Sequence, residues 1–173
     1  MGILPIRIYP DPVLRVTCPP VERFDDELRQ LAADMVVTMH AAPGIGLAAP
    51  QVGVELRLAV VDLSGGENPE ELLTLVNPAI RRSHGSQTDI EGCLSLPGIT
   101  EKITRPARVW VEAQDLDGES FQLEADELLA RALCHEIDHL DGVLFIDYLT
   151  GLKKERMRRQ IKRLARAPEA VTA

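Results

Sequence analysis

The chain has 173 residues, of which 45% are hydrophobic and 27% charged, and it carries a net charge of −8 at pH 7. This length fits one ordinary domain over residues 1–173, and the composition is that of a globular protein, which excludes disordered and fibrous classes. Three cysteines are a sparse and odd set, which argues against a secreted disulfide framework and favours a reducing compartment.

The first half of the chain predicts one helix followed by short strands. A helix is expected over residues 25–40, where apolar residues recur at helical spacing. A loop rich in Gly and Pro follows over residues 42–53. Two strands are then expected over residues 55–62 and 72–77, with a turn between them.

The second half of the chain predicts extended segments followed by two helices. Residues 90–98 are extended and interrupted by Gly and Pro, and residues 108–113 and 120–123 flank a turn typical of a β-hairpin. A helix is expected over residues 126–141, where a glycine ends it, and a last helix over residues 150–166. Several strands followed by helices, without regular alternation, favour an α+β fold over a parallel doubly wound sheet.

The last predicted helix is strongly basic. Residues 153–166 hold eight of the 19 Lys and Arg residues and a single acid, so the remainder of the chain is strongly acidic. A concentrated basic tail on an acidic body favours a partner that carries phosphates. No apolar run is long enough to span a membrane, and the first residues lack the features of a signal or transit peptide, so we expect a cytoplasmic protein without membrane contact.

The clearest chemical signal is the sequence His135-Glu136-Ile137-Asp138-His139, an HExxH motif inside a predicted helix. Positions i and i+4 share one helix face, so both imidazoles can reach one metal ion. Glu136 then lies near the open coordination position. The alternative is that both histidines are ordinary core residues, because Leu128 and Ala132 lie on the same apolar stripe.

A third ligand decides the class of protein. A metzincin peptidase needs a histidine where Phe145 stands, and a gluzincin needs a downstream glutamate, where only Glu155 and Glu169 follow, both in the basic tail. Cys93, within Glu91-Gly92-Cys93-Leu94-Ser95, is the best soft ligand. A thiolate and two neutral imidazoles leave one position open, as catalytic sites require, and suit zinc or ferrous iron.

Three segments together resemble, in order, the three motifs of peptide deformylases. They are GIGLAAPQ at residues 44–51, EGCLS at 91–95 and HEIDHLDG at 135–142, and the resemblance extends from about Pro10 to the C-terminal helix. The resemblance implies an α+β fold with antiparallel sheets around a central HExxH helix. It also implies removal of the N-formyl group from the initiator methionine of nascent bacterial or organellar polypeptides, with release of formate.

The resemblance further implies a metal site made by Cys93, His135 and His139. It implies one divalent ion, with Fe²⁺ as the physiological ion and Zn²⁺, Ni²⁺ or Co²⁺ as other occupants. Glu136 would take a proton from the attacking water and later deliver it to the leaving amine.

Further residues are assigned to the substrate by the same resemblance. The Gln51 side chain and the Leu94 backbone N–H would donate to the oxyanion, together with the metal. Gly46 would let the substrate backbone approach closely because it has no Cβ, although a simple turn glycine would look the same. A pocket for the methionine side chain is expected from three residues that would equally fit a core: Ile45, Leu128 and Ala132.

Several positions depart from the family pattern. Cys134 stands where many members have Gln, and we expect a small buried residue there. Thr100 stands where many relatives have an Arg or Tyr that contacts the peptide. Arg131, one turn before His135, either takes over that contact or, as we expect, is a solvent-exposed helix residue.

The resemblance also implies that the basic C-terminal helix docks on ribosomal RNA near the nascent-chain exit, and we expect a monomer. Two alternatives remain at this point. A metallopeptidase is supported by the HExxH motif alone. A non-catalytic ribosome-binding module with a structural metal would need a fourth ligand from Cys18 or Cys134, and it would leave Glu136 without a role.

Overall fold

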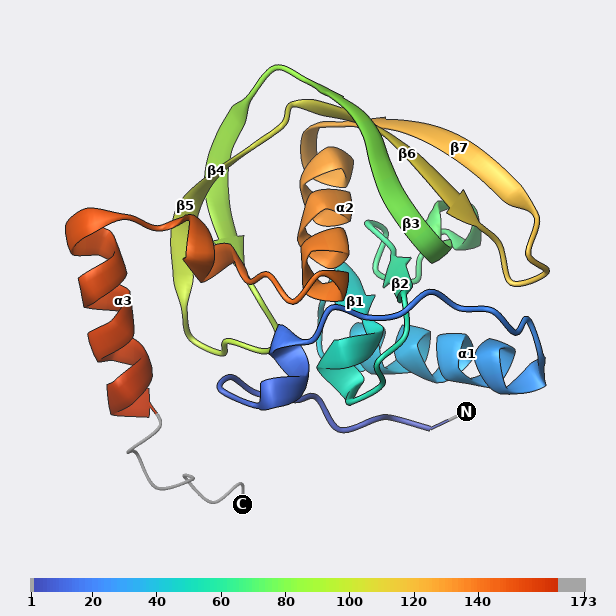
Figure 1. The fold of residues 1–173 in the computed structure, drawn as a ribbon, viewed down its shortest axis with the longest axis horizontal. Helices are drawn as coiled ribbons and strands as arrows, with labels where there is room; N and C mark the ends of the chain where they lie inside the picture. Colours follow the sequence, from blue (N-terminus) through green and yellow to red (C-terminus); the bar gives the residue numbers. More distant parts are fainter. Residues whose placement is uncertain (1, 165–173) are drawn as a thin grey trace.

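Two antiparallel sheets and three α-helices make up residues 2–164, which the computed structural model describes (Figure 1). The larger sheet has five strands in the order β1-β2-β3-β6-β7, and the smaller sheet pairs β4 with β5. The strands are β1 (Gly46–Ala48), β2 (Leu58–Val61), β3 (Leu73–His84), β4 (Gln87–Gly92), β5 (Thr100–Arg105), β6 (Arg108–Gln114) and β7 (Ser120–Asp126). The helices are α1 (Asp26–Ala41), α2 (Glu127–Leu140) and α3 (Gly151–Leu164), with short 3-10 turns at η1 (Pro12–Arg15), η2 (Ala49–Val52), η3 (Pro69–Glu71) and η4 (Phe145–Tyr148).

Most expected elements occur close to their predicted bounds, and the expected α+β class with antiparallel sheets is confirmed. The predicted hairpin is β6 and β7, which pair along their whole length. Two strands were not predicted, namely β1 inside the Gly- and Pro-rich loop and β5. Of the segment expected to be extended over residues 90–98, only residues 90–92 belong to a strand, the end of β4. The strand expected over residues 72–77 continues to His84 as β3, because its exposed polar end still pairs with β6. The last two residues of the helix expected over 150–166 lie outside the described residues, as does Glu169.

Helix α2 packs on the five-stranded sheet. The buried apolar side chains between them form a hydrophobic cluster, which we call the sheet cluster. Its members include Val61, Leu75, Val111, Leu133 and Ile137. In Figure 1, α2 lies between this sheet and the β4–β5 pair. The helix ends where Gly142 adopts a φ of +72°, a left-handed conformation that favours glycine.

A second hydrophobic cluster, which we call the η4 cluster, lies on the other side of α2. It joins the segment after β4 to η4 and α3, and its members are Leu96, Ile99, Ile103, Leu144, Phe145, Ile146, Leu149 and Met157. Cys93 packs against this cluster. The HExxH helix and the segment that bears Cys93 therefore pack into different hydrophobic clusters.

None of the helices between residues 2 and 164 combines the length and apolar character that a membrane crossing requires.

Candidate active site

His135 and His139 lie one turn apart on α2, and both are buried. Their Nε2 atoms are 3.2 Å apart, and the Sγ atom of Cys93, which follows the end of β4, lies 3.2 Å from His139 Nε2. The three candidate ligand atoms all lie within 4.8 Å of one another. Two elements that are distant in the chain thus bring the three residues nominated by the sequence to one point.

These three side chains fit a metal ion. Around a tetrahedral ion with bonds of about 2.0–2.3 Å, neighbouring donor atoms are roughly 3.3–3.7 Å apart. The 3.2 Å separations of His139 Nε2 from His135 Nε2 and from Cys93 Sγ are close to this range. The Nδ1 atom of His135 donates to Glu91 Oε1 at 2.6 Å, which leaves Nε2 of the same ring as the ligand atom. One sulfur and two imidazole nitrogens suit Zn²⁺ or Fe²⁺.

Other cysteines do not join this group. Among the described residues, neither Cys18 nor Cys134 lies with the three candidate ligand atoms, so a closed structural site lacks its fourth ligand there. Cys134 is buried, as expected, and burial raises the pKa of its thiol to about 11, which opposes the thiolate that a metal requires. Phe145, at the third ligand position of a metzincin, is instead buried with its ring 6.3 Å from that of His135.

Glu136 is buried beside the ligands, and its Oε2 atom has no hydrogen-bond partner among residues 2–164. Burial raises the pKa of this carboxyl to about 7, the range in which it can both take up and release a proton. The side chain lies against Gly46 of β1, where an added Cβ would overlap the carboxylate. Gly46 therefore provides room for Glu136, whereas the sequence suggested only room for the substrate.

The electrostatics behind the ligands favour a cation. Burial opposes a charge on His135, but hydrogen bonds to Cys93 and Glu91 outweigh burial and raise the pKa of His135 to about 10. Burial likewise opposes ionisation of Glu91, yet hydrogen bonds from His135 and Arg105 lower its pKa to about 2. Burial, and then the charge of His135, lower the pKa of His139 well below its usual value, which keeps this imidazole neutral. A fixed anion behind one ligand and a neutral second ligand suit a bound metal cation.

Gln51 projects from η2 toward Cys93. Its Oε1 atom accepts from the backbone N–H of Ala48 at 2.8 Å, which fixes the orientation of the amide. Its Nε2 atom then donates to Ser95 Oγ at 3.2 Å and lies 3.5 Å from Cys93 Sγ. Leu94 follows Cys93 directly, and Gln51 and Leu94 both line a cavity whose walls include Cys93 and His135.

A cavity of about 490 Å³ opens onto these residues. Its walls include all four residues expected to contact the substrate: Ile45, Gly46, Leu128 and Ala132. Ala132 is buried, whereas Ile45 and Leu128 are 39% and 50% exposed and lie on the solvent side. Thr100 also lines the cavity.

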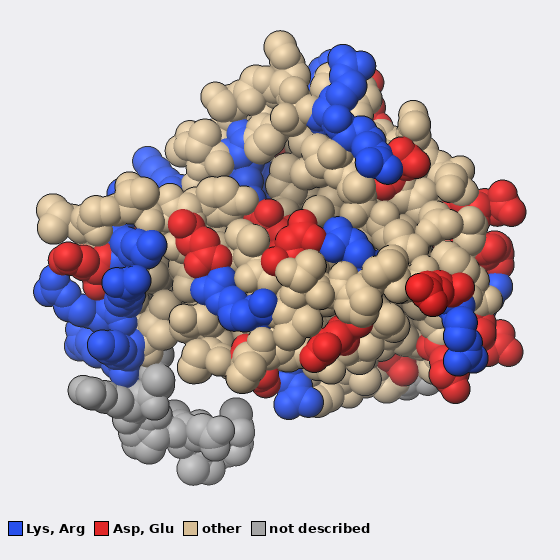
Figure 2. All heavy atoms as spheres, viewed as in Figure 1, with Lys and Arg blue, Asp and Glu red and all other residues tan. Residues whose placement is uncertain are grey.

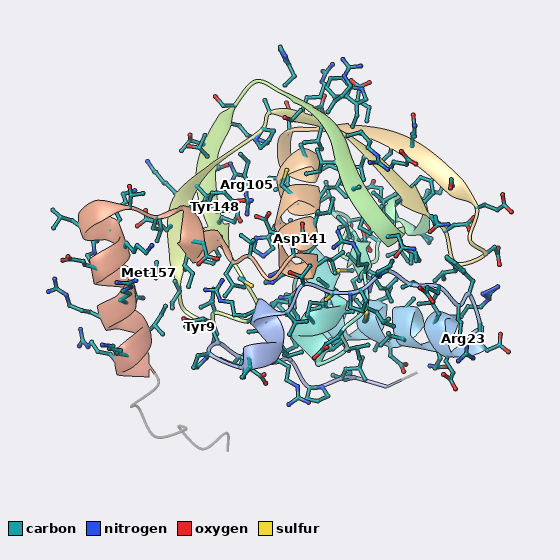
Figure 3. The ribbon with its side chains drawn as sticks, in the orientation of Figure 1. Tyr9, Arg23, Arg105, Asp141, Tyr148 and Met157 are labelled. Carbon is teal, nitrogen blue, oxygen red and sulfur yellow. The ribbon has the colours of Figure 1, made fainter. Side chains whose placement is uncertain are left out.

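Sequence reasoning missed a buried ionic network behind the site. Glu91 on β4 accepts from His135 Nδ1 and from Arg105, whose Nη2 donates to Oε1 at 2.6 Å and whose Nε donates to Oε2 at 3.1 Å. Arg105 also forms an ion pair with Asp138 of the HExxH motif. Figure 3 shows Arg105 beside Tyr148, whose ring centre lies 4.7 Å from the guanidinium carbon. The one available signal was an acid inside the cysteine motif.

The expectation that Arg131 is exposed to solvent is wrong. The residue is only 5% exposed. Its Nη1 atom donates to Glu91 Oε2 at 2.8 Å and to the Ile103 carbonyl at 3.1 Å. Its Nη2 atom donates to the Gln87 carbonyl at 3.3 Å. A helical periodicity placed this residue correctly on α2 but could not show that β4 and β5 cover it.

An HExxH helix with a sulfur ligand beside it, a buried glutamate next to the first histidine and a cavity that opens onto them define a metal-dependent hydrolase. The comparisons with known proteins identify which hydrolase family this is.

The family described as polypeptide deformylase matches residues 3–155. The chain is 53% identical over 169 residues to a peptide deformylase of Acidobacterium capsulatum. The aligned residues make up 98% of this chain and 99% of that protein. The structure of a peptide deformylase from Legionella pneumophila matches with a TM-score of 0.87 and 46% identity, over 96% of this chain and 99% of the other. A plant peptide deformylase matches with a TM-score of 0.89 and 39% identity, over 93% and 88% of the two chains.

The chain belongs to the peptide deformylase family. Members of this family are hydrolases that use a single divalent metal ion to remove the N-formyl group from formylmethionyl nascent peptides.

Proposed function

We propose that Cys93, His135 and His139 hold the metal ion of this deformylase and that Glu136 carries the proton in the reaction. The observation that supports this proposal is the convergence of the three ligand atoms within 4.8 Å of one another, with Cys93 and His135 lining the cavity. A divalent ion held there supplies Lewis-acid chemistry and lowers the pKa of water.

The remaining steps belong to residues of this chain. Glu136 can accept the proton of the attacking water, since Oε2 lacks a partner among the described residues and burial raises the pKa of the carboxyl to about 7. The same carboxyl then protonates the leaving amine. Gln51 Nε2 and the Leu94 N–H donate hydrogen bonds to the oxyanion that forms at the formyl carbon. The products are formate and a peptide with a free α-amine.

The methionine side chain occupies the cavity between Ile45, Leu128 and Ala132 in this proposal, next to the backbone of Gly46. An apolar pocket discriminates by only about 1–3 kcal/mol per methylene. Related apolar first residues are therefore expected to react more slowly rather than to be excluded.

Fe²⁺ is the ion that we propose, with Zn²⁺, Ni²⁺ or Co²⁺ as other occupants. A donor set of one sulfur and two nitrogens supports this range of ions. We further propose that residues 1–173 form one domain arranged around α2, that the protein is a monomer, and that it acts in the bacterial cytoplasm, where nascent chains emerge.

The basic helix α3 is proposed to bind ribosomal RNA. Figure 2 shows Lys and Arg side chains gathered over α3, while Met157 on the same helix is buried in the η4 cluster. The helix therefore docks by an apolar side and offers its cations to phosphates. Truncation after Gly151 is expected to weaken salt-sensitive pelleting with ribosomes and to spare turnover of short peptides. Equal pelleting of both forms would exclude this partner.

The activity is tested by formate release from formyl-Met-Ala-Ser, with anaerobically prepared, iron-loaded protein beside Glu136→Ala. We expect turnover by the parent and loss of turnover in a variant that still binds one ion. Retained turnover in the variant would remove Glu136 from its role. A folded, iron-loaded parent that releases no formate would overturn the proposal and restore the metallopeptidase or the structural-metal alternative.

A further inference from the structure

The candidate metal ligands lie on both sides of the junction between the two hydrophobic clusters. His135 and His139 are carried by α2, which belongs to the sheet cluster, whereas Cys93 packs against the η4 cluster. An apolar contact also reaches from the η4 cluster to α2, since the ring of Phe145 lies 6.3 Å from that of His135. Hydrogen bonds and ion pairs between the β4–β5 pair and α2 add directional contacts that hold the sulfur and the imidazoles in one geometry.

Buried charged side chains make these contacts. Glu91 lies two residues before Cys93, and its carboxylate accepts from His135 on α2. Arg105 on β5 binds both Glu91 and Asp138, so it connects the smaller sheet to α2 a second time. The Glu91–His135 and Arg105–Asp138 contacts each join a strand of the β4–β5 pair to the HExxH helix, and the Arg105–Glu91 ion pair links the two strands.

Arg131 also connects the two parts, and here the donor lies on α2 and the acceptors lie on the strands. Its guanidinium donates to three acceptors on two strands: Glu91 Oε2 at 2.8 Å, the Ile103 carbonyl at 3.1 Å and the Gln87 carbonyl at 3.3 Å. The two carbonyls belong to β5 and to the start of β4. Because a planar guanidinium binds several acceptors at fixed angles, it fixes the position of a strand pair more tightly than a point charge does.

We propose that Arg131 is a positioning residue for the metal centre. It holds Glu91 behind His135 and ties β4, the strand that ends next to Cys93, to the helix that carries the two histidines. This inference rests on the proposed metal site and adds a residue outside the three sequence motifs. Arg131 acts through Glu91 and the strand backbone, and it does not touch the reacting atoms.

A role in substrate binding would use the same side chain differently. Arg131 lines the cavity, so an exposed guanidinium there would attract a peptide carbonyl or carboxylate. Its Nη atoms are instead engaged by protein acceptors, and the side chain is 6% exposed. The contacts thus favour a role in holding the ligands.

Co²⁺ is a suitable probe, because its visible absorption reports coordination geometry independently of turnover. We would measure the dissociation constant and the absorption spectrum of Co²⁺ in the parent, Arg131→Met and Arg131→Lys, together with kcat and KM. We expect Arg131→Met to bind Co²⁺ about 10- to 100-fold more weakly, with an altered spectrum and a lowered kcat at similar KM. Arg131→Lys keeps the positive charge but lacks the planar guanidinium with its several donors, so we expect an intermediate affinity for Co²⁺.

Arg108→Met is the matched control, since Arg108 forms ion pairs with Glu124 and Asp126 at the surface of β6 and β7. It should leave Co²⁺ binding and turnover unchanged. If Arg131→Met does not fold, as judged by circular dichroism, Arg131→Lys and Arg131→Gln carry the test with the same expected order. Unchanged Co²⁺ affinity and spectrum in the folded Arg131 variants, or a raised KM alone, would overturn the positioning role. A parent that binds no Co²⁺ would instead overturn the proposed metal site.

Discussion

The carboxylate of Glu136 occupies the space that a side chain at Gly46 would need. A Cβ built at residue 46 would lie 2.8 Å from the carboxyl carbon of Glu136, well inside van der Waals contact. The first motif and the HExxH motif are therefore interlocked: a glycine on β1 sets where the glutamate of α2 can lie.

Replacement of this glycine by alanine tests the contact. We expect Gly46→Ala to lower kcat by about 10²-fold, because a displacement of about 1 Å moves the carboxyl away from the water it must deprotonate. Metal content should be unchanged, since the atoms nearest to the new methyl group all belong to Glu136, which is not a ligand. Gly2→Ala, with nothing within 4 Å of the added Cβ, is the control. A Gly46→Ala enzyme with parental kcat would show that Glu136 is not held by this contact.

The amide of Gln51 provides a second prediction. Gln51→Leu keeps the volume of the buried side chain but removes the Nε2 donor that lies 3.2 Å from Ser95 Oγ. We expect kcat to fall roughly 10²- to 10³-fold, the usual loss when one oxyanion donor is removed. Steady-state kinetics on formyl-Met-Ala-Ser check this value. Gln122→Leu, at an exposed position on β7, should have no effect. A change confined to KM would contradict an oxyanion role.

Two cysteines offer a matched test of metal binding. Cys93→Ala should bind metal roughly tenfold or more weakly and lose it on dialysis, because the thiolate ligand is gone. Cys134→Ala, next to His135, should retain one ion per chain, since that thiol lies outside the ligand group. Metal analysis after dialysis distinguishes the two. Loss of the ion from Cys134→Ala as well as from Cys93→Ala would favour the closed structural site.

Asp62 is expected to make stability depend on acid pH. The hydroxyl of Ser64 has the largest effect in lowering the pKa of Asp62, and His40 and the backbone N–H groups of Ser64 and Gly66 lower it further. Because the folded state has the lower pKa, the unfolded state binds more protons in this range. The stabilisation is therefore complete above the ordinary pKa of about 4 and is lost as pH falls through the lowered value.

Asp62→Asn should reduce the free energy of unfolding by about 1–3 kcal/mol at pH 7. The difference from the parent should narrow as the pH falls below about 4. Urea denaturation at several pH values measures both quantities, and Asp117→Asn, at a side chain that is 72% exposed, is the control. A difference that stays constant from pH 7 to pH 3 would mean that the charge of Asp62 does not stabilise the fold.

Local sequence patterns were sufficient for the elements that carry the motifs. The apolar periodicity and the following glycine placed α2 within one residue of its bounds, and the turn residues placed the β6–β7 hairpin. Three residues, Cys93, His135 and His139, were nominated because their spacing and chemistry are specific to metal binding.

The ionic network could not be predicted in the same way. Arg131 looks like a solvent-exposed helix residue in sequence, since its burial depends on Glu91 and on strand carbonyls that only the tertiary fold supplies. The strand β5 was also missed, because Thr100–Arg105 is mostly polar and is held by its pairing with β4 rather than by an apolar pattern.

Cys93 packs against the η4 cluster, whereas the two histidines lie on α2, which packs into the sheet cluster. This arrangement couples metal occupancy to unfolding. A ligand that binds only the native state raises its stability by about 2.7 kcal/mol when present at 100 times its dissociation constant. We expect removal of the ion by a chelator to lower the melting temperature and to speed amide hydrogen exchange first in β4 and β5. A compound that extracts the ion would then shorten the lifetime of the folded protein as well as stop its chemistry.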